Sequence, residues 1–187
     1  MVHLLLALVL TMTGGEDSSA VTTIGSYTVP IVISDTSGHQ FGITFGVDPK
    51  ATYGFDMSLG EEPIPPPPTV SAFDIRFLDP LQRKMPYNGM GAYLDVRPYV
   101  SRTQVDTFYV RFQPNNDSFP MTITWPVKIK DAVDSACVIF RSAGSLVRIN
   151  MLKERAVRVV DGTVNTCIIV TYGVKPPLPK KKWRGEG

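Results

Sequence analysis

Few residues in this chain could support acid–base, nucleophilic or metal chemistry. The sequence holds two histidines, His3 and His39, and two cysteines. A serine or cysteine nucleophile needs a histidine base, and zinc needs three or four such ligands at defined spacing. His3 lies in an apolar N-terminal segment typical of a cleaved export signal, so only His39 remains for these roles. We therefore expect no catalytic site, no cofactor and no enzyme activity.

Carboxylates gather in one connecting segment. Asp48 and Asp56 lie eight positions apart around Gly54, and Glu61 follows just beyond. Calcium prefers clustered oxygen ligands in flexible loops, so these three acids are the candidate metal ligands. The alternative is that Asp48 and Asp56 cap turns through their side chains. Lys50, inside the same loop, favours turn capping.

The two cysteines, Cys137 and Cys167, both occupy apolar, strand-like runs, ACVIF and TCIIV. In an oxidising compartment they could form one disulfide, and closing a loop of about 30 residues would stabilise the fold by about 3–4 kcal/mol. The alternative is a pair of buried free thiols that act as small apolar side chains.

Aromatic side chains are the remaining candidates for binding. Tyr109 and Trp125, with Tyr93 and Tyr99, would form a carbohydrate-binding platform if they converged on one face. They could equally be cross-strand pairs at the rim of a sheet, and we favour this second interpretation.

The elements that must position these residues are strands. Short runs with a period of two, broken by Gly, Pro, Asn and Asp, recur along the chain, and no window keeps helical periodicity. The predicted strands are Tyr27–Ser34, Gln40–Val47, Ala72–Leu78, Ala92–Tyr99, Val105–Gln113, Met121–Trp125, Ala136–Arg141, Leu146–Met151, Ala156–Val160 and Thr166–Tyr172. Strands with one apolar and one polar face predict an antiparallel, all-β sandwich.

The segments between and around the strands suggest the domain organisation. We expect a signal peptide at 1–20, a sandwich domain at 21–174 and a disordered basic tail at 175–187. Within the domain, the proline-rich connection 61–69 holds four consecutive prolines, which favour a stiff extended rod. We expect this rod to cross from one sheet to the other.

Charge and hydropathy exclude some partners. The net charge is only +2, which is too small to indicate nucleic-acid binding by bulk electrostatics. No apolar run approaches the roughly 20 residues that cross a bilayer, so we expect no membrane insertion.

Two blocks of the sequence resemble a known family. Phe45–Phe77 reads FGVDPKATYGFDMSLGEEPIPPPPTVSAFDIRF, and Val105–Pro126 reads VDTFYVRFQPNNDSFPMTITWP. Both are similar to a module of large exported bacterial proteins that use type IX secretion. The resemblance implies a secreted or cell-surface, immunoglobulin-like β-sandwich without catalysis, used as a spacer or adhesion element. The family turn often carries Asp where this chain has Tyr53, which disfavours calcium.

We therefore expect a non-catalytic extracellular module with a structural or surface-interaction role. One alternative is a self-assembling fibre subunit, because Tyr27–Ser34 is apolar and Pro30 suggests an edge strand that could be donated to a neighbouring copy. The other is a carbohydrate-binding module built on the aromatics above. The expected partners are other copies of the chain, surface proteins or glycans.

Overall fold

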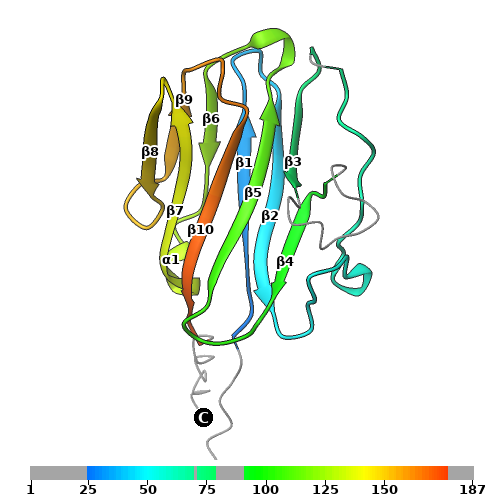
Figure 1. Cartoon of the computed structure of the whole chain (residues 1–187), viewed down its shortest axis with the longest axis vertical. Coiled ribbons are helices and arrows are strands. Elements are labelled where there is room, and N and C mark those ends of the chain that lie inside the picture. Colours follow the sequence, from blue (N-terminus) through cyan, green and yellow to red (C-terminus); the bar gives the residue numbers. More distant parts are fainter. Residues whose placement is uncertain (1–24, 70, 79–90, 177–187) are drawn as a thin grey trace, which may run out of the picture.

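Ten β-strands dominate the computed structural model, which describes residues 25–69, 71–78 and 91–176 (Figure 1). The strands are β1 (Tyr27–Ser34), β2 (Gln40–Asp48), β3 (Asp74–Leu78), β4 (Leu94–Pro98), β5 (Val105–Gln113), β6 (Met121–Thr124), β7 (Val133–Ser142), β8 (Ser145–Asn150), β9 (Ala156–Val159) and β10 (Thr166–Val174). Three short helical turns lie between them: η1 (Met57–Leu59), η2 (Asn115–Asp117) and α1 (Ile129–Ala132). All ten predicted strands are confirmed, and the largest difference is at β7, which begins three residues earlier than predicted.

The strands form two five-stranded sheets that pack face to face (Figure 1). Sheet A has the order β4-β2-β1-β6-β9, and sheet B has the order β3-β5-β10-β7-β8. The predicted all-β sandwich is therefore confirmed. One pair departs from the antiparallel prediction, since β2 and β4 run parallel. A parallel pair needs a long crossover connection, and the chain between β2 and β4 passes through β3 of the other sheet.

Alternation along the strands fills the space between the sheets. In β5, Phe108, Val110 and Phe112 are fully buried, whereas Tyr109 and Arg111 point away from the core. Phe108 meets Phe45 of sheet A with ring centroids 4.8 Å apart. Burying an aromatic or branched aliphatic side chain contributes about 1.5–3 kcal/mol, so these inward positions hold the two layers together.

The position of β1 corrects the expectation of an edge strand. It lies in the middle of sheet A, paired with β2 along its whole length and with β6 from Val32 to Ser34. Thr124 Oγ1 donates to the Val32 carbonyl, so Pro30, two residues earlier, directs its nitrogen to the same side. The pairing of β1 with β6 covers only Val32 to Ser34, so no β6 residue lies opposite Pro30. The missing N–H of Pro30 therefore costs the sheet no hydrogen bond.

The turn between β7 and β8 is a two-residue hairpin. Ser142 pairs with Ser145, and the two residues between them, Ala143 and Gly144, have φ of 48° and 79°. Two successive positive φ values match the right-handed twist of the flanking strands, as in hairpins generally. The tight turn holds β8 as the last strand of sheet B.

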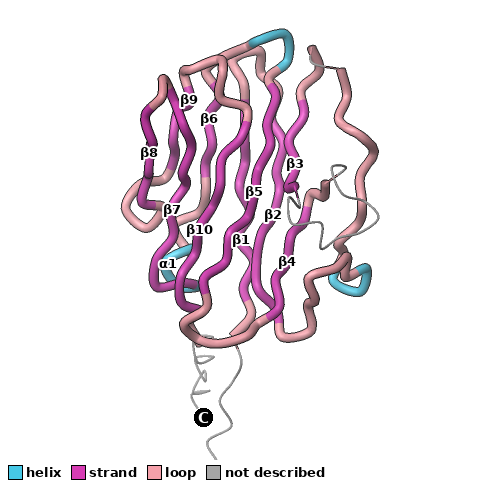
Figure 2. The backbone as a smooth tube through the Cα atoms, in the orientation of Figure 1, coloured by secondary structure: helices cyan, strands magenta, loops and turns pink. Residues whose placement is uncertain are grey.

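The proline-rich connection crosses from β2 of sheet A to β3 of sheet B, as predicted. Figure 2 shows it as part of a long loop beside β3 and β4. The backbone N–H of Ile64 donates to the Gly91 carbonyl, and the Arg76 guanidinium donates to the Pro65 carbonyl at 2.7 Å. The Gln113 amide donates to the Thr69 carbonyl at 2.6 Å. These bonds fix the connection along one lateral side of the sandwich.

The predicted signal peptide at 1–20 and all but the first two residues of the predicted basic tail lie outside the described residues. Within the ranges that the structure describes, no helix has the length and apolar character needed to cross a membrane.

Candidate functional site

The three candidate calcium ligands serve as hydrogen-bond acceptors for the backbone. Asp48 accepts the N–H of Lys50 at 2.8 Å, and Asp56 accepts the N–H of Thr52 at 2.6 Å. Glu61 is fully buried and bridges two segments, accepting the N–H of Asp56 at 2.9 Å. Its second oxygen accepts a backbone N–H from β4, that of Val96, at 2.8 Å. No group of three possible metal ligands occurs among the described residues, and the contacts match the turn-capping alternative.

The two cysteines are free thiols rather than a disulfide. They lie on the neighbouring strands β7 and β10, where Cys137 pairs with Val170 and therefore not with Cys167. Cys167 points into the core, whereas Cys137 belongs to the outward-facing set of β7, so the two thiols lie on opposite faces of sheet B. Burial raises the pKa of Cys167 to about 12, which keeps that thiol neutral.

His39 lies in the β1–β2 turn beside a serine and an aspartate, but not in a catalytic arrangement. Its Nδ1 is 2.8 Å from Ser37 Oγ and 3.8 Å from Asp35 Oδ2. A catalytic relay places serine and aspartate on the two different ring nitrogens, whereas here both face Nδ1. The Ser37 hydroxyl also donates to Asp35 at 2.7 Å. The cluster therefore stabilises the turn.

Asp35 is the centre of that turn and ties it to the η2 segment. One carboxylate oxygen accepts the backbone N–H groups of Ser37 and His39, and the other accepts that of Asn115. Burial alone would raise the pKa of this carboxyl, but the hydrogen bonds from Asn115, Ser37 and His39 together outweigh burial. The pKa of Asp35 is consequently held below its ordinary value.

The aromatic platform, which was the less favoured interpretation of the sequence, does not form. Trp125 is only 5% exposed, and its indole N–H donates to the carbonyl oxygens of Met151 and Glu154 at 2.9 and 3.0 Å. Tyr109 instead lies on the outer face of sheet B. Tyr93 lies beside β2 of sheet A and packs on Phe41, with ring centroids 4.7 Å apart. Tyr109 and Trp125 therefore do not converge, because the inward position of Trp125 places it in the core.

Two buried ion pairs lie at the β3 and β4 side, and the sequence analysis missed both. Arg76 donates to Asp74 at 2.6 and 2.7 Å on the outer face of β3, beneath the proline-rich connection. Arg97 donates to Asp95 at 2.6 Å inside the sandwich, with its guanidinium carbon 5.4 Å from the Phe108 ring centre. The shared Asp-x-Arg spacing in FDIRF and LDVRP is the signal that could have found them. Both pairs are buried, and their charged groups contact other parts of the fold.

The outer face of sheet B is the surface with the clearest binding character. One row of paired residues runs across all five strands, from β3 through β5, β10 and β7 to β8. Its members are Leu78, Tyr109, Ile168, Ile139 and Arg148. All four apolar members are half-buried and are directed away from the core. The next row, Thr107, Val170, Cys137 and Asn150, continues the apolar surface at its centre.

The apolar outer face of sheet B corresponds to continuous apolar runs in the sequence. ACVIF in β7 and TCIIV in β10 do not alternate, so both faces of these two strands carry apolar side chains. Strands of this kind are typical of sheets that are covered on both faces. The same runs predict the strands β7 and β10, and their lack of alternation is the signal of an apolar outer face.

A cavity of about 440 Å³ opens on this face. Its wall includes Leu78, Tyr109 and Ile168 from the apolar row, with Arg141 and Thr166 from the neighbouring row. Ligand cavities are typically about 300–1,000 Å³, largely apolar, with a few polar groups that orient the ligand. The geometry can therefore accept a bulky apolar group and offers it one guanidinium at the rim.

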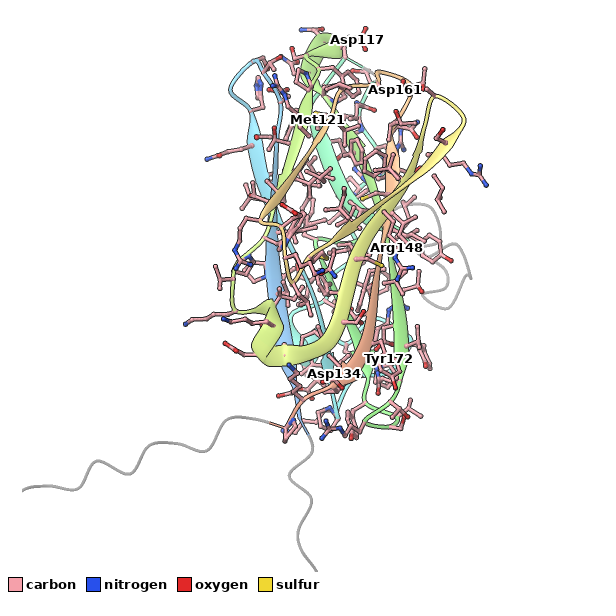
Figure 3. All side chains as sticks on the ribbon, turned by 90° about the vertical axis from the view of Figure 1, so that its left-hand side faces the viewer. Asp117, Met121, Asp134, Arg148, Asp161 and Tyr172 are labelled. Carbon is pink, nitrogen blue, oxygen red and sulfur yellow. The ribbon has the colours of Figure 1, made fainter. Side chains whose placement is uncertain are left out.

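Arginines surround the apolar row. Arg111 pairs across the strands with Thr166, Arg141 lines the cavity, and Arg148 ends the apolar row. In Figure 3, Asp161, Arg148 and Tyr172 follow one another along the sheet B side. Within the part of the chain that the structure describes, none of these three arginines forms an ion pair.

Comparisons with known proteins found no relative of this chain. The chain matches no protein-family model, and neither the curated proteins nor the solved structures include a significant match. The function must therefore be argued from the geometry of this molecule.

Proposed function

We propose that this chain is a non-catalytic, immunoglobulin-like β-sandwich that acts as an extracellular structural or surface-interaction module and binds its partner through the outer face of sheet B. One observation carries the proposal, namely the apolar row of Leu78, Tyr109, Ile168 and Ile139 that crosses four strands on a face directed away from the core. A contiguous apolar patch on an outer surface is typical of an interaction site.

The bonding of the ionisable residues supports a role without catalysis. Asp35, Asp56 and Glu61 each accept backbone hydrogen bonds, and the contacts of His39 stabilise its turn. Secretion to the cell surface is supported by the resemblance of Phe45–Phe77 and Val105–Pro126 to modules of type IX exported proteins.

The other two candidate functions have less support. Strand donation by Tyr27–Ser34 would break pairing with β2 along the whole strand and with part of β6. A carbohydrate platform lacks its expected partner for Tyr109, because Trp125 is buried.

Site-specific photo-crosslinking in the cells that make the protein tests the proposed surface. A photo-reactive phenylalanine analogue replaces Ile168 on the outer face of sheet B or, as the matched control, Val32 on the outer face of sheet A. Val32 is 39% exposed, so the control is equally open to solvent or more so. We expect a discrete covalent adduct with a partner protein from position 168 and none from position 32. Adducts from both positions, or from neither, would contradict the proposal.

The non-catalytic part of the proposal has its own test. The purified protein is assayed against ester, peptide and glycoside substrates. A turnover that disappears in His39→Ala or Glu61→Gln, while the circular dichroism spectrum is retained, would overturn it.

A further inference from the structure

The cavity on the outer face of sheet B combines an apolar wall with a cationic rim, and this combination specifies the chemistry of what binds there. Leu78 and Ile168 are aliphatic, and Tyr109 adds one ring. Arg141 belongs to the cavity wall itself. A fitting ligand must therefore bring a bulky apolar group and a negative charge close together.

The positive charge comes from Arg141, which lines the cavity, and from Arg111 and Arg148, which lie on the same face of sheet B. Arg111 is half-buried, and Arg141 and Arg148 are exposed. Across the described ranges, none of the three has a carboxylate within ion-pair distance. The β9–β10 loop carries one acid, Asp161, whose oxygens accept bonds from Ser142, Ala143 and Thr163. Those bonds hold the pKa of Asp161 well below its usual range, so it remains a structural anion of the two turns.

Charge complementarity distinguishes among the possible occupants. Two copies packed with these faces together would bring like-charged arginines into one interface, and such juxtaposition is costly. A single-stranded nucleic acid would match the charge, but it binds best on several stacked aromatic rings. Two aromatic residues line the cavity, but Phe140 is buried in the core and only Tyr109 lies on the outer face. The other lining residues are mostly aliphatic, with Thr163, Asn165 and Thr166 as polar members. An acidic peptide satisfies both features, because arginine pairs with carboxylates through two parallel hydrogen bonds.

We propose that the outer face of sheet B binds a segment of a partner protein in which carboxylates flank a bulky apolar residue. The apolar side chain enters the cavity beside Tyr109 and Ile168. The carboxylates pair with Arg141 and with either Arg111 or Arg148. This inference rests on the proposed function and adds to it the class of partner.

A titration followed by NMR of the ¹⁵N-labelled full chain tests the proposal. The probes are three N-acetylated, C-amidated pentapeptides, namely Gly-Asp-Leu-Asp-Gly, Gly-Asn-Leu-Asn-Gly and Gly-Lys-Leu-Lys-Gly, together with an oligothymidylate. We expect the acidic peptide to cause saturable shifts at the amides of Tyr109, Thr166 and Ile168. The neutral peptide should bind at least about tenfold more weakly, which corresponds to about 1.4 kcal/mol. The basic peptide and the oligothymidylate should leave these amides unchanged.

Matched charge reversals complete the test. Arg141→Glu should weaken binding of the acidic peptide at least about tenfold, and Arg141→Gln by a smaller factor. Arg158→Glu makes the same charge change on an exposed residue of β9 in sheet A and should leave the affinity unchanged. Because Arg141 is exposed, the spectra of the free variants should match the parent away from the substitution.

The outcomes separate this proposal from the proposed function. Equal binding of the acidic and neutral peptides, or of the oligothymidylate at the same amides, overturns the acidic-peptide proposal and leaves sheet B as the docking face. Equal losses in Arg141→Glu and Arg158→Glu also overturn it. If no probe shifts sheet B but position 168 still crosslinks in cells, only the acidic-peptide proposal fails. If position 168 gives no crosslink either, the proposed function fails with it.

Discussion

The buried arginines at the β3 and β4 side differ from the arginines on the outer face of sheet B in what they contact. Arg76 and Arg97 are each 2% exposed and each donates to the aspartate two residues earlier. Arg111, Arg141 and Arg148 have more exposure and, in the described part of the chain, no ion pair. The same side chain therefore serves the fold in one region and is available to a partner in the other.

The comparison extends to the two outer faces of the sandwich. The middle row of sheet A consists of Ala156, Thr124, Val32 and Gly42. The corresponding row of sheet B holds Leu78, Tyr109, Ile168 and Ile139. Small and polar residues suit a face that meets water, whereas large apolar residues beside unpaired arginines suit a face that meets another molecule.

Arg97→Ala should cause the largest loss of stability. The substitution leaves the carboxylate of Asp95, which is 1% exposed, in the core without this guanidinium. Breaking a buried pair in this way costs about 3–5 kcal/mol. Chemical denaturation with urea measures the change in the free energy of unfolding. A loss below about 1 kcal/mol would show that Arg97 contributes little to the stability of the fold.

Arg76→Ala should cause a smaller loss, because a single connecting segment rather than a second sheet covers this pair. The substitution removes hydrogen bonds to Asp74 and to the Pro65 carbonyl. Water can reach a site covered by a single segment and replace part of the lost bonding, so we expect a loss of about 2–3 kcal/mol, below the range for a buried pair in the core. Protection of the Ile64 amide against hydrogen exchange should fall in this variant. In Arg97→Ala, the protection of the Ile64 amide should fall by no more than the free energy of unfolding of the whole domain.

Replacing the whole interior pair should cost little. Arg97 Nε and Nη1 have no hydrogen-bond partner in the part of the chain that the structure describes, so the pair is incompletely satisfied. In Asp95→Leu with Arg97→Met, apolar side chains fill a similar volume. We expect a free energy of unfolding within about 1 kcal/mol of the parent, or higher. A loss as large as that of Arg97→Ala alone would indicate that the pair itself stabilises the core.

The contribution of the Asp35 carboxylate to stability should depend on pH, unlike that of the arginines. Its pKa is lower in the folded chain than the ordinary 3.8, so its stabilising contribution is present above about pH 4 and is lost as the pH falls through the folded value. Asp35→Asn should lower stability at pH 7 and reduce the loss of stability between about pH 4 and pH 2. Urea titrations across this range compare the two proteins, and parallel pH profiles would contradict the assignment.

Periodicity in the sequence predicted the strands well, but it could not predict which faces are covered. The alternation in FDIRF separates Ile75 and Phe77, which face the core, from Asp74 and Arg76. A charged face of a strand normally meets water, yet here the proline-rich connection covers it. That cover depends on where residues distant in sequence lie, which local patterns do not encode.

Register explains the other differences. The sequence does not reveal which residues of two strands are opposite, and the pairing of Cys137 with Val170 separates the two thiols. Residue type alone does not distinguish the buried Trp125 from the exposed tyrosines, because burial depends on where the residue lies in the fold. The turn at Gly144, by contrast, is predictable, since glycine adopts a positive φ without steric cost. The positive φ of Ala143 is not a local preference of alanine and is imposed by the two-residue hairpin.

The free energy of unfolding of one triple variant, Arg111→Gln, Arg141→Gln and Arg148→Gln, tests the central claim most directly. If these arginines serve a partner rather than the fold, each substitution should change stability by no more than about 0.5 kcal/mol. The account therefore predicts a total change within about 1.5 kcal/mol by urea denaturation at pH 7. A loss of about 3 kcal/mol or more, comparable to that of Arg97→Ala, would contradict it, because the outer-face arginines would then stabilise the sandwich itself.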